Sequence, residues 1–151
     1  MVSLSRPVDP DAPPSRTGRG WALLLIGMGG ALGTMLRAAL ESAFSPAPGG
    51  WPWATFSINV VGAFLLAALL EALSLLGPDD GWLRGTRLGV GTGVLGGFTT
   101  YSAYMVETVQ LGEAGGYLLG LGYAATSLFL GFVAAWSGMV AVAAVHRRRV
   151  G

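Results

Sequence analysis

Four long apolar stretches dominate the chain, and short segments rich in glycine, proline and charge separate them. The stretches cover approximately residues 20–44, 55–76, 88–111 and 116–145. Each is about as long as the roughly 20 apolar residues that a helix needs to cross a bilayer. None has the polar face that a helix of a water-soluble bundle would show. The pattern therefore predicts an all-α membrane protein with four transmembrane helices.

The composition agrees with this fold class and excludes several others. Only 11% of the 151 residues are charged and 52% are hydrophobic, whereas soluble domains carry about 25% charged residues. The sequence has no cysteine, which excludes a disulfide framework, thiolate metal sites and a cysteine nucleophile. The single histidine, His146, stands in a basic cluster. With no nucleophile–base pair and no phosphate loop in the sequence, we expect neither an enzyme nor a nucleic-acid partner.

The two ends of the chain differ from the apolar part. Residues 1–19 are rich in proline, serine, aspartate and arginine without apolar periodicity, which predicts a disordered basic N-terminal tail. A signal peptide with residues 21–28 as its apolar part is the alternative, but no small-residue cleavage site follows at the right distance. We therefore expect a transmembrane domain over 20–145 and a basic C-terminal tail over 146–151.

The basic residues, all of them arginines, are distributed unevenly along the chain. Four spans would place eight of them on one side of the membrane, namely Arg6, Arg16, Arg19, Arg84, Arg87 and Arg147 to Arg149. The loops on the other side, 45–54 and 112–115, contain none. Cytoplasmic loops carry an excess of arginine and lysine. This asymmetry predicts a multi-pass plasma-membrane protein with both termini in the cytoplasm and one fixed orientation.

Polar side chains within the apolar stretches are candidate functional groups, because each costs about 2.5–3.5 kcal/mol on insertion scales. Asn59 could form an interhelical hydrogen bond or could donate its amide N–H to an anion in a pore. Arg37 could extend to the membrane surface, pair with Glu41 one turn later, or attract anions into a vestibule. The residues alone leave these alternatives open.

The segment 91–104 is the least helix-like part of the apolar region. Adjacent glycines followed by Thr99 and Thr100 could free backbone carbonyl groups, which membranes tolerate only where the backbone is buried or lines a cavity. Exposed carbonyls favour a small hard cation such as Na⁺. The alternative is that the glycines serve close helix packing. The sequence thus indicates a broken third helix with two possible purposes.

Aromatic and hydroxyl side chains follow at helical spacing. Tyr101 and Tyr104 lie three residues apart and would present ring edges, which carry positive partial charge, on one face. Tyr123 and Ser127 lie four apart in the last stretch and would form a hydroxyl track. Such aromatic stripes more often serve packing, and a lone hydroxyl in a span usually bonds the carbonyl one turn back.

Three motifs occur in order on the first three stretches. They are Gly-Gly-x-x-Gly-x-x-x-Arg from Gly29, Thr-x-x-x-Asn-x-x-Gly-x-Phe from Thr55, and Gly-x-x-Gly-Gly-x-Thr-Thr-Tyr-Ser-x-Tyr-x-x-Glu from Gly93. With these motifs, residues 26–145 resemble the small bacterial fluoride channels, the Fluc or CrcB family. The resemblance implies passive, fluoride-selective conduction by two antiparallel subunits that form two pores.

The resemblance also implies roles for particular residues. The main-chain carbonyls of Gly96 and Thr99 would hold a structural Na⁺ at the centre of the dimer, and Arg37 would stand near the vestibule. Fluoride is small and strongly hydrated, so each lost water must be replaced by another hydrogen-bond donor. The positions that correspond to the family's pore are Asn59, Tyr101, Ser102, Tyr104, Tyr123 and Ser127.

Two departures from the family pattern bear on function. Tyr101 and Tyr104 stand where the family has phenylalanines, so each adds a hydroxyl that could donate to fluoride or narrow the path. The arginine asymmetry is the second, because an antiparallel homodimer requires one chain to insert in both orientations. The hypothesis is a heterodimer with an oppositely biased homologue, with a homodimer as the alternative.

Two other functions remain open from the sequence. A small four-helix multidrug-type transporter is also dimeric, but it relies on a membrane-embedded glutamate in its first helix, and Glu41 stands near the end of the first stretch. A non-conducting membrane scaffold subunit would use its polar residues only to hold helices together.

Overall fold

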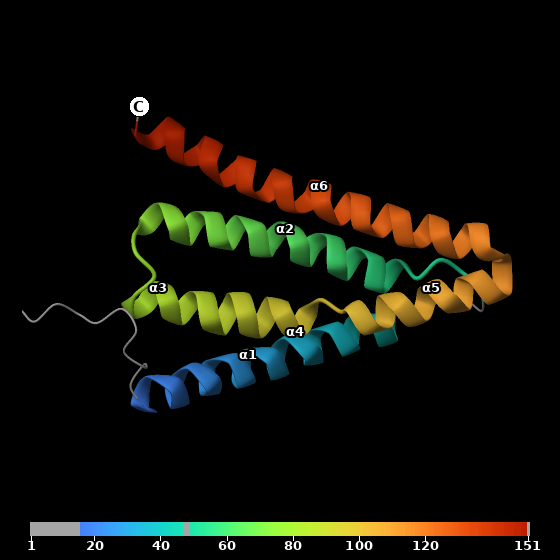
Figure 1. The fold of residues 1–151 in the computed structure, drawn as a ribbon, viewed down its shortest axis with the longest axis horizontal. Helices are drawn as coiled ribbons and strands as arrows, with labels where there is room; N and C mark the ends of the chain where they lie inside the picture. Colours follow the sequence, from blue (N-terminus) through green and yellow to red (C-terminus); the bar gives the residue numbers. More distant parts are fainter. Residues whose placement is uncertain (1–15, 47–48, 151) are drawn as a thin grey trace, which may run out of the picture.

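The computed structural model describes residues 16–46 and 49–150, and in that part the chain is built from helices and short connections (Figure 1). Three helices are long and apolar enough to cross a membrane. They are α1 (Arg16–Ala43), α2 (Trp53–Leu76) and α6 (Tyr117–Val150). The region between α2 and α6 consists of shorter elements: α3 (Gly81–Thr86), η1 (Arg87–Leu95), α4 (Gly96–Phe98) and α5 (Tyr101–Gly115).

The ends of the long helices differ from the predicted tail boundaries. Helix α1 begins at Arg16, so residues 16–19, predicted as tail, are helical, while residues 1–15 lie outside the described residues. Helix α6 continues past the predicted boundary at 145 to Val150. Arginine is a good helix former, and arginines in a last turn compensate the negative end of the helix dipole. Both effects favour the extension of α6, whereas at the start of α1 only the helix propensity of arginine does, because cations oppose the positive end of the dipole.

The third apolar region is interrupted after α4. Thr99 (φ −78°, ψ 154°) and Thr100 (φ −143°, ψ 128°) are extended, and the chain becomes helical again at Tyr101. This is the interruption that the Gly-Gly-x-Thr-Thr segment predicts. The glycine-rich part before it, η1, is a π-helix of nine residues, a wide helix that is usually confined to single turns near functional sites.

Helix α1 packs against η1 and α4 through glycines, a contact that we call the glycine seam (Gly29, Gly30, Gly33, Gly93 and Gly97). A Cβ added to Gly33 would overlap the Val94 carbonyl oxygen, and one added to Gly97 would overlap the Gly30 carbonyl oxygen. The two backbones are therefore in direct contact. Close packing is thus the observed purpose of these glycines.

The helices lie roughly side by side (Figure 1). The elements α3, η1, α4 and α5 follow one another in a line that we call the broken helix. On one side of it lies α2, with α6 beyond, and on the other side lies α1. The start of α1, the short helix α3 and the end of α6 lie at one end of the molecule. The connection into α2 and the α5–α6 turn lie at the other. The described arginine clusters outside the apolar stretches are therefore on the same side, as four spans require.

Few side chains of residues 16–46 and 49–150 are buried within the single chain. A buried cluster in this part consists of Tyr104, Leu111 and Tyr123, with Trp51 and Phe56 packed against it. Many large apolar side chains are exposed instead, as expected when lipid or a second subunit covers them. Tyr104 of this cluster follows the break by one helical turn, so the cluster lies beside it.

Candidate functional site at the helix break

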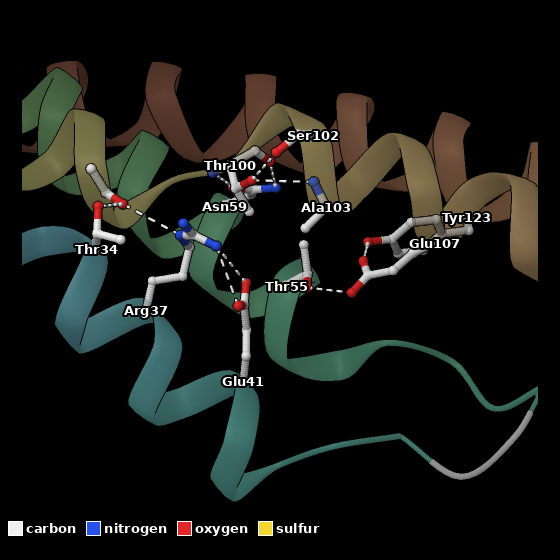
Figure 2. Close-up of polar contacts among 11 residues, drawn as sticks. Thr34, Arg37, Glu41, Thr55, Asn59, Thr100, Ser102, Ala103, Glu107 and Tyr123 are labelled. Carbon is white, nitrogen blue, oxygen red and sulfur yellow. Dashed lines mark hydrogen bonds and ion pairs between the residues drawn. The ribbon is translucent and has the colours of Figure 1, made fainter.

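Asn59 of α2 binds both backbone polar groups of Thr100, a residue of the break (Figure 2). Its Nδ2 donates to the Thr100 carbonyl oxygen at 2.9 Å, and its Oδ1 accepts from the Thr100 N–H at 2.8 Å. Each unsatisfied backbone group at membrane depth would cost several kcal/mol. Asn59 therefore supplies the partners that a continuous helix would have given, and one N–H of its amide is not used in these two bonds.

The break also changes the partners of two backbone carbonyls. In a continuous α-helix, the carbonyls of Gly96 and Thr99 would accept from the N–H groups of Thr100 and Ala103. Here the Thr100 N–H donates to Asn59, and the Ala103 N–H donates to the Thr100 hydroxyl at 3.2 Å. Both carbonyls thus lose their regular helical donors. Carbonyl oxygens of this kind are ligands that a hard cation such as Na⁺ accepts.

Arg37 lies at the end of the glycine seam, close to the break. Its Nη1 is 3.2 Å from Glu41 Oε1, which is the i, i+4 ion pair considered from the sequence. Its Nε donates to the Gly97 carbonyl at 3.4 Å, and the Thr34 hydroxyl reaches the same oxygen at 3.4 Å. Arg37 therefore links α1 to α4 and places a cation beside the break.

Glu107 of α5 connects three helices (Figure 2). It accepts a hydrogen bond from the Thr55 hydroxyl of α2 at 2.6 Å and one from the Tyr123 hydroxyl of α6 at 2.8 Å. Thr55 and Tyr123 are almost fully buried, at 1% and 0% exposure. Glu107 is the last residue of the motif that begins at Gly93, and it was not among the predicted site residues. The high cost of a charge within a span, which drew attention to Arg37, was the signal that could have found it.

Three tyrosines form a row that runs from the start of α5 to α6. The ring centroids of Tyr101 and Tyr104 are 5.8 Å apart, and those of Tyr104 and Tyr123 are 5.6 Å apart. The Tyr104 hydroxyl donates to the Ala124 carbonyl at 3.1 Å, and the Tyr123 hydroxyl donates to Glu107. Tyr101 is 72% exposed. The hydroxyl hydrogens of the two buried tyrosines therefore have protein acceptors.

The two serines among the candidates differ in their surroundings. Ser102 Oγ lies 3.3 Å from Thr100 Oγ1, so it belongs to the break. Ser127 stands one turn after Tyr123, and its Oγ is buried without a hydrogen-bond partner in the described part of the chain. The structure thus brings Asn59 and Ser102 together at the break, Tyr101, Tyr104 and Tyr123 in the row, and Arg37 on the α1 side.

Long apolar helices with an amide, an arginine and a glutamate among them define a multi-pass α-helical membrane protein. Residues 24–139 match the CrcB-like protein family, Camphor Resistance (CrcB). The chain belongs to this family, as its motifs indicated.

Several curated bacterial proteins are similar to most of the chain. A protein of Cutibacterium acnes named fluoride-specific ion channel FluC 1 is 47% identical over 125 residues, which are 83% of this chain and 87% of the relative. Fluoride-specific ion channel FluC 2 of Leifsonia xyli subsp. xyli is 49% identical over 130 residues, covering 86% and 89%. Fluoride-specific ion channel FluC of Thermus thermophilus is 44% identical over 119 residues, covering 76% and 90%.

Proposed function

We propose that this chain is a subunit of a fluoride-specific ion channel that lets F⁻ leave the cytoplasm down its electrochemical gradient. The observation that carries the proposal is the break at Thr99 and Thr100, held by Asn59 and present in a chain whose relatives are named fluoride-specific channels. Glu41 is paired with Arg37, which disfavours the multidrug-type transporter because that class needs an available glutamate. Because its relatives are named ion channels, we expect no enzymatic activity of the chain.

The ion would pass along the donors that are not fully used by the protein. These are the second amide N–H of Asn59, the Ser102 hydroxyl, and the positive ring edges of Tyr101 and Tyr104. Thr55 and Tyr123 donate to Glu107, so Glu107 orients the hydroxyl track that continues toward Ser127. Arg37 would raise the local concentration of anions near the break. In this arrangement weak donors replace the water shell of fluoride one by one.

A structural Na⁺ fits the same break. The carbonyls of Gly96 and Thr99, without their regular helical donors, are the groups that would hold it. When bound, the ion would supply a fixed positive charge that favours anions nearby. Arg37 already places a cation on the neighbouring Gly97 carbonyl, so with the ion bound the break would have a positive charge on two sides.

The functional unit would contain four spans per chain and two chains in antiparallel orientation in the plasma membrane. The region from α3 to α5, which lies between α2 and α6 in the chain, would be the third of these four spans. It would cross the membrane in two parts, one on either side of the break. With the arginine clusters cytoplasmic, both termini would be cytoplasmic. We favour pairing with an oppositely biased homologue over a homodimer, because the eight-to-none distribution of arginines opposes insertion in both orientations.

Fluoride efflux from liposomes tests the function. The purified chain is reconstituted alone and with any paired homologue, and external fluoride is followed with a fluoride electrode after valinomycin is added to carry K⁺. We expect rapid fluoride release from at least one of the two preparations. Absence of release from both, with folded protein in the vesicles, would contradict the channel.

Orientation is tested separately by topology tagging of the C-terminus of the chain expressed alone. We expect a single cytoplasmic orientation. An equal mixture of orientations would remove the argument for a heterodimer and leave the channel proposal intact.

A further inference from the structure

An apolar groove of about 320 Å³ lies between the C-terminal parts of α2 and α6, at the end of the molecule where the arginine clusters gather. Six apolar side chains line it, three from each helix: Ala72, Leu75, Leu76, Ala141, Val142 and Val145. His146 and Arg149 also line it, and they stand at its terminal end because they follow Val145 on α6. The groove contains none of the residues of the helix break.

The charge around the terminal end of the groove is predominantly positive. Arg147, Arg148 and Arg149 form the last described turn of α6, and none of them has an ion-pair partner among the described side chains. The nearby loop after α2 contains Asp79 and Asp80. Asp79 is already bound by Arg87, with Arg87 Nη2 to Asp79 Oδ2 at 2.6 Å. Asp80, outside the groove lining, is the remaining acidic side chain of that loop.

The groove is apolar along α2 and α6 and ends at a guanidinium. In the orientation proposed above, this end would lie at the membrane surface, where such a groove suits an amphiphile with an anionic head. A hydrocarbon chain fits between the leucine and valine side chains, and a phosphate accepts hydrogen bonds from guanidinium and imidazole N–H groups. Basic residues next to transmembrane helices attract anionic lipid headgroups. We propose that this groove binds an anionic phospholipid, with an acyl chain between α2 and α6 and its phosphate at Arg149 and His146.

Native mass spectrometry of the purified full-length protein tests the headgroup contact. The protein is titrated with phosphatidylglycerol or phosphatidylcholine of the same chain length. We expect tighter binding of phosphatidylglycerol, and an Arg149→Gln variant should lose about five-fold in that affinity and less in the affinity for phosphatidylcholine, whose phosphate charge is balanced by its own choline group. Arg84→Gln is the matched control, because Arg84 is an exposed arginine at the same end of the molecule but outside the groove. An equal loss in both variants would overturn the site.

A second variant tests the acyl-chain contact without changing charge. Ala141→Phe fills the groove, and we expect it to weaken binding of both lipids at the site. Unchanged phosphatidylglycerol binding would contradict the proposal. So would dissociation of a dimer by Ala141→Phe, since a second subunit would then be the occupant.

Competition with millimolar inorganic phosphate separates the two sources of phosphate. Displacement of the lipid by phosphate alone would show an anion site, and lipid that stays bound in phosphate supports the lipid site. Because Arg149 is exposed at a helix end, Arg149→Gln keeps the test decisive if Ala141→Phe does not fold.

Discussion

The two sides of the helix break share close backbone packing but differ in the polar contacts beside it. Before Thr99, η1 and α4 contact α1 backbone to backbone along the glycine seam, where an added methyl group at Gly33 or Gly97 meets a carbonyl oxygen. After Thr100, α5 also approaches α6 closely, because a Cβ added to Gly120 would lie 2.6 Å from the Thr108 carbonyl oxygen. The second side adds a buried polar contact that joins three helices, with Glu107 accepting hydrogen bonds from α2 and α6. We infer that the seam fixes where the break is, and that the α5 side provides its chemistry.

The largest expected effect is on the seam. Gly33→Ala places a Cβ against the Val94 carbonyl oxygen and 2.8 Å from the Phe98 backbone nitrogen, and backbone atoms cannot move aside as a flexible side chain can. We expect a loss of about 3 kcal/mol or more in the free energy of unfolding, measured as a lower melting temperature in detergent. Gly27→Ala is the matched control on the same helix, because an added Cβ there has no neighbour within 4 Å. Equal stability of the two variants would show that α1 and η1 are not in close contact.

A smaller loss of stability and a larger loss of function are expected on the other side. Glu107→Gln has only one carbonyl oxygen and cannot accept from both Thr55 and Tyr123 in the same way. We expect about a ten-fold drop in fluoride efflux, since a lost hydrogen bond to a charged group costs roughly 1.5–3 kcal/mol. Glu113→Gln, on an exposed position of the same helix, should conduct normally. Wild-type efflux in Glu107→Gln would mean that the three-helix contact only holds the fold.

The tyrosines should show a graded, modest effect. Tyr104→Phe removes the hydrogen bond to the Ala124 carbonyl but keeps the ring edge, so we expect a melting temperature reduced by the equivalent of about 1 kcal/mol and fluoride efflux close to wild type. Tyr101→Phe should leave stability unchanged, because that side chain is largely exposed. A strong loss of efflux in Tyr104→Phe would show that its hydroxyl, and not its ring edge, faces the ion.

The smallest effect concerns the ion pair between the α2–α3 connection and the first residue of η1. The hydrogen bond from Arg87 lowers the pKa of the Asp79 carboxyl below its ordinary value. A lowered pKa in the folded state stabilises the protein above the ordinary carboxyl pKa, and this contribution is lost as the pH falls through the lowered value. We expect Asp79→Asn to be slightly less stable than wild type at neutral pH, with the difference shrinking as the pH falls below the ordinary carboxyl pKa of about 4. A difference in melting temperature that does not shrink in acid would show that the pair does not contribute through charge.

Much of this architecture follows from local properties of the sequence. Runs of about twenty apolar residues between breakers predict the long helices, and Gly-Gly-x-Thr-Thr predicts the interruption, because these properties belong to neighbouring residues. The pairing of Arg37 with Glu41 was accessible for the same reason, since residues four apart on a helix face each other.

The contacts that decide the site were less accessible because they join distant residues. Asn59 and Thr100 are 41 positions apart, and Thr55 and Glu107 are 52 apart. Only the packing of α2 against the elements from α3 to α5 brings them together. From the sequence, Asn59 could therefore be either an interhelical hydrogen-bond partner or a donor to an anion, and Glu107 had no predicted role. The tail boundaries were placed where the apolar pattern ends, whereas α1 begins earlier, at Arg16, and α6 continues through Arg147.

The central claim is that the break held by Asn59 is where fluoride is conducted, and Asn59→Asp tests it most directly. The aspartate keeps an acceptor for the Thr100 N–H but loses the donor for the Thr100 carbonyl and the remaining N–H that would face the anion. Fluoride efflux is measured in liposomes and normalised to folded protein, with any paired homologue present. We predict at least a ten-fold reduction of efflux relative to wild type. Wild-type efflux from folded Asn59→Asp protein would contradict the claim and leave Asn59 as a purely structural link between α2 and the break.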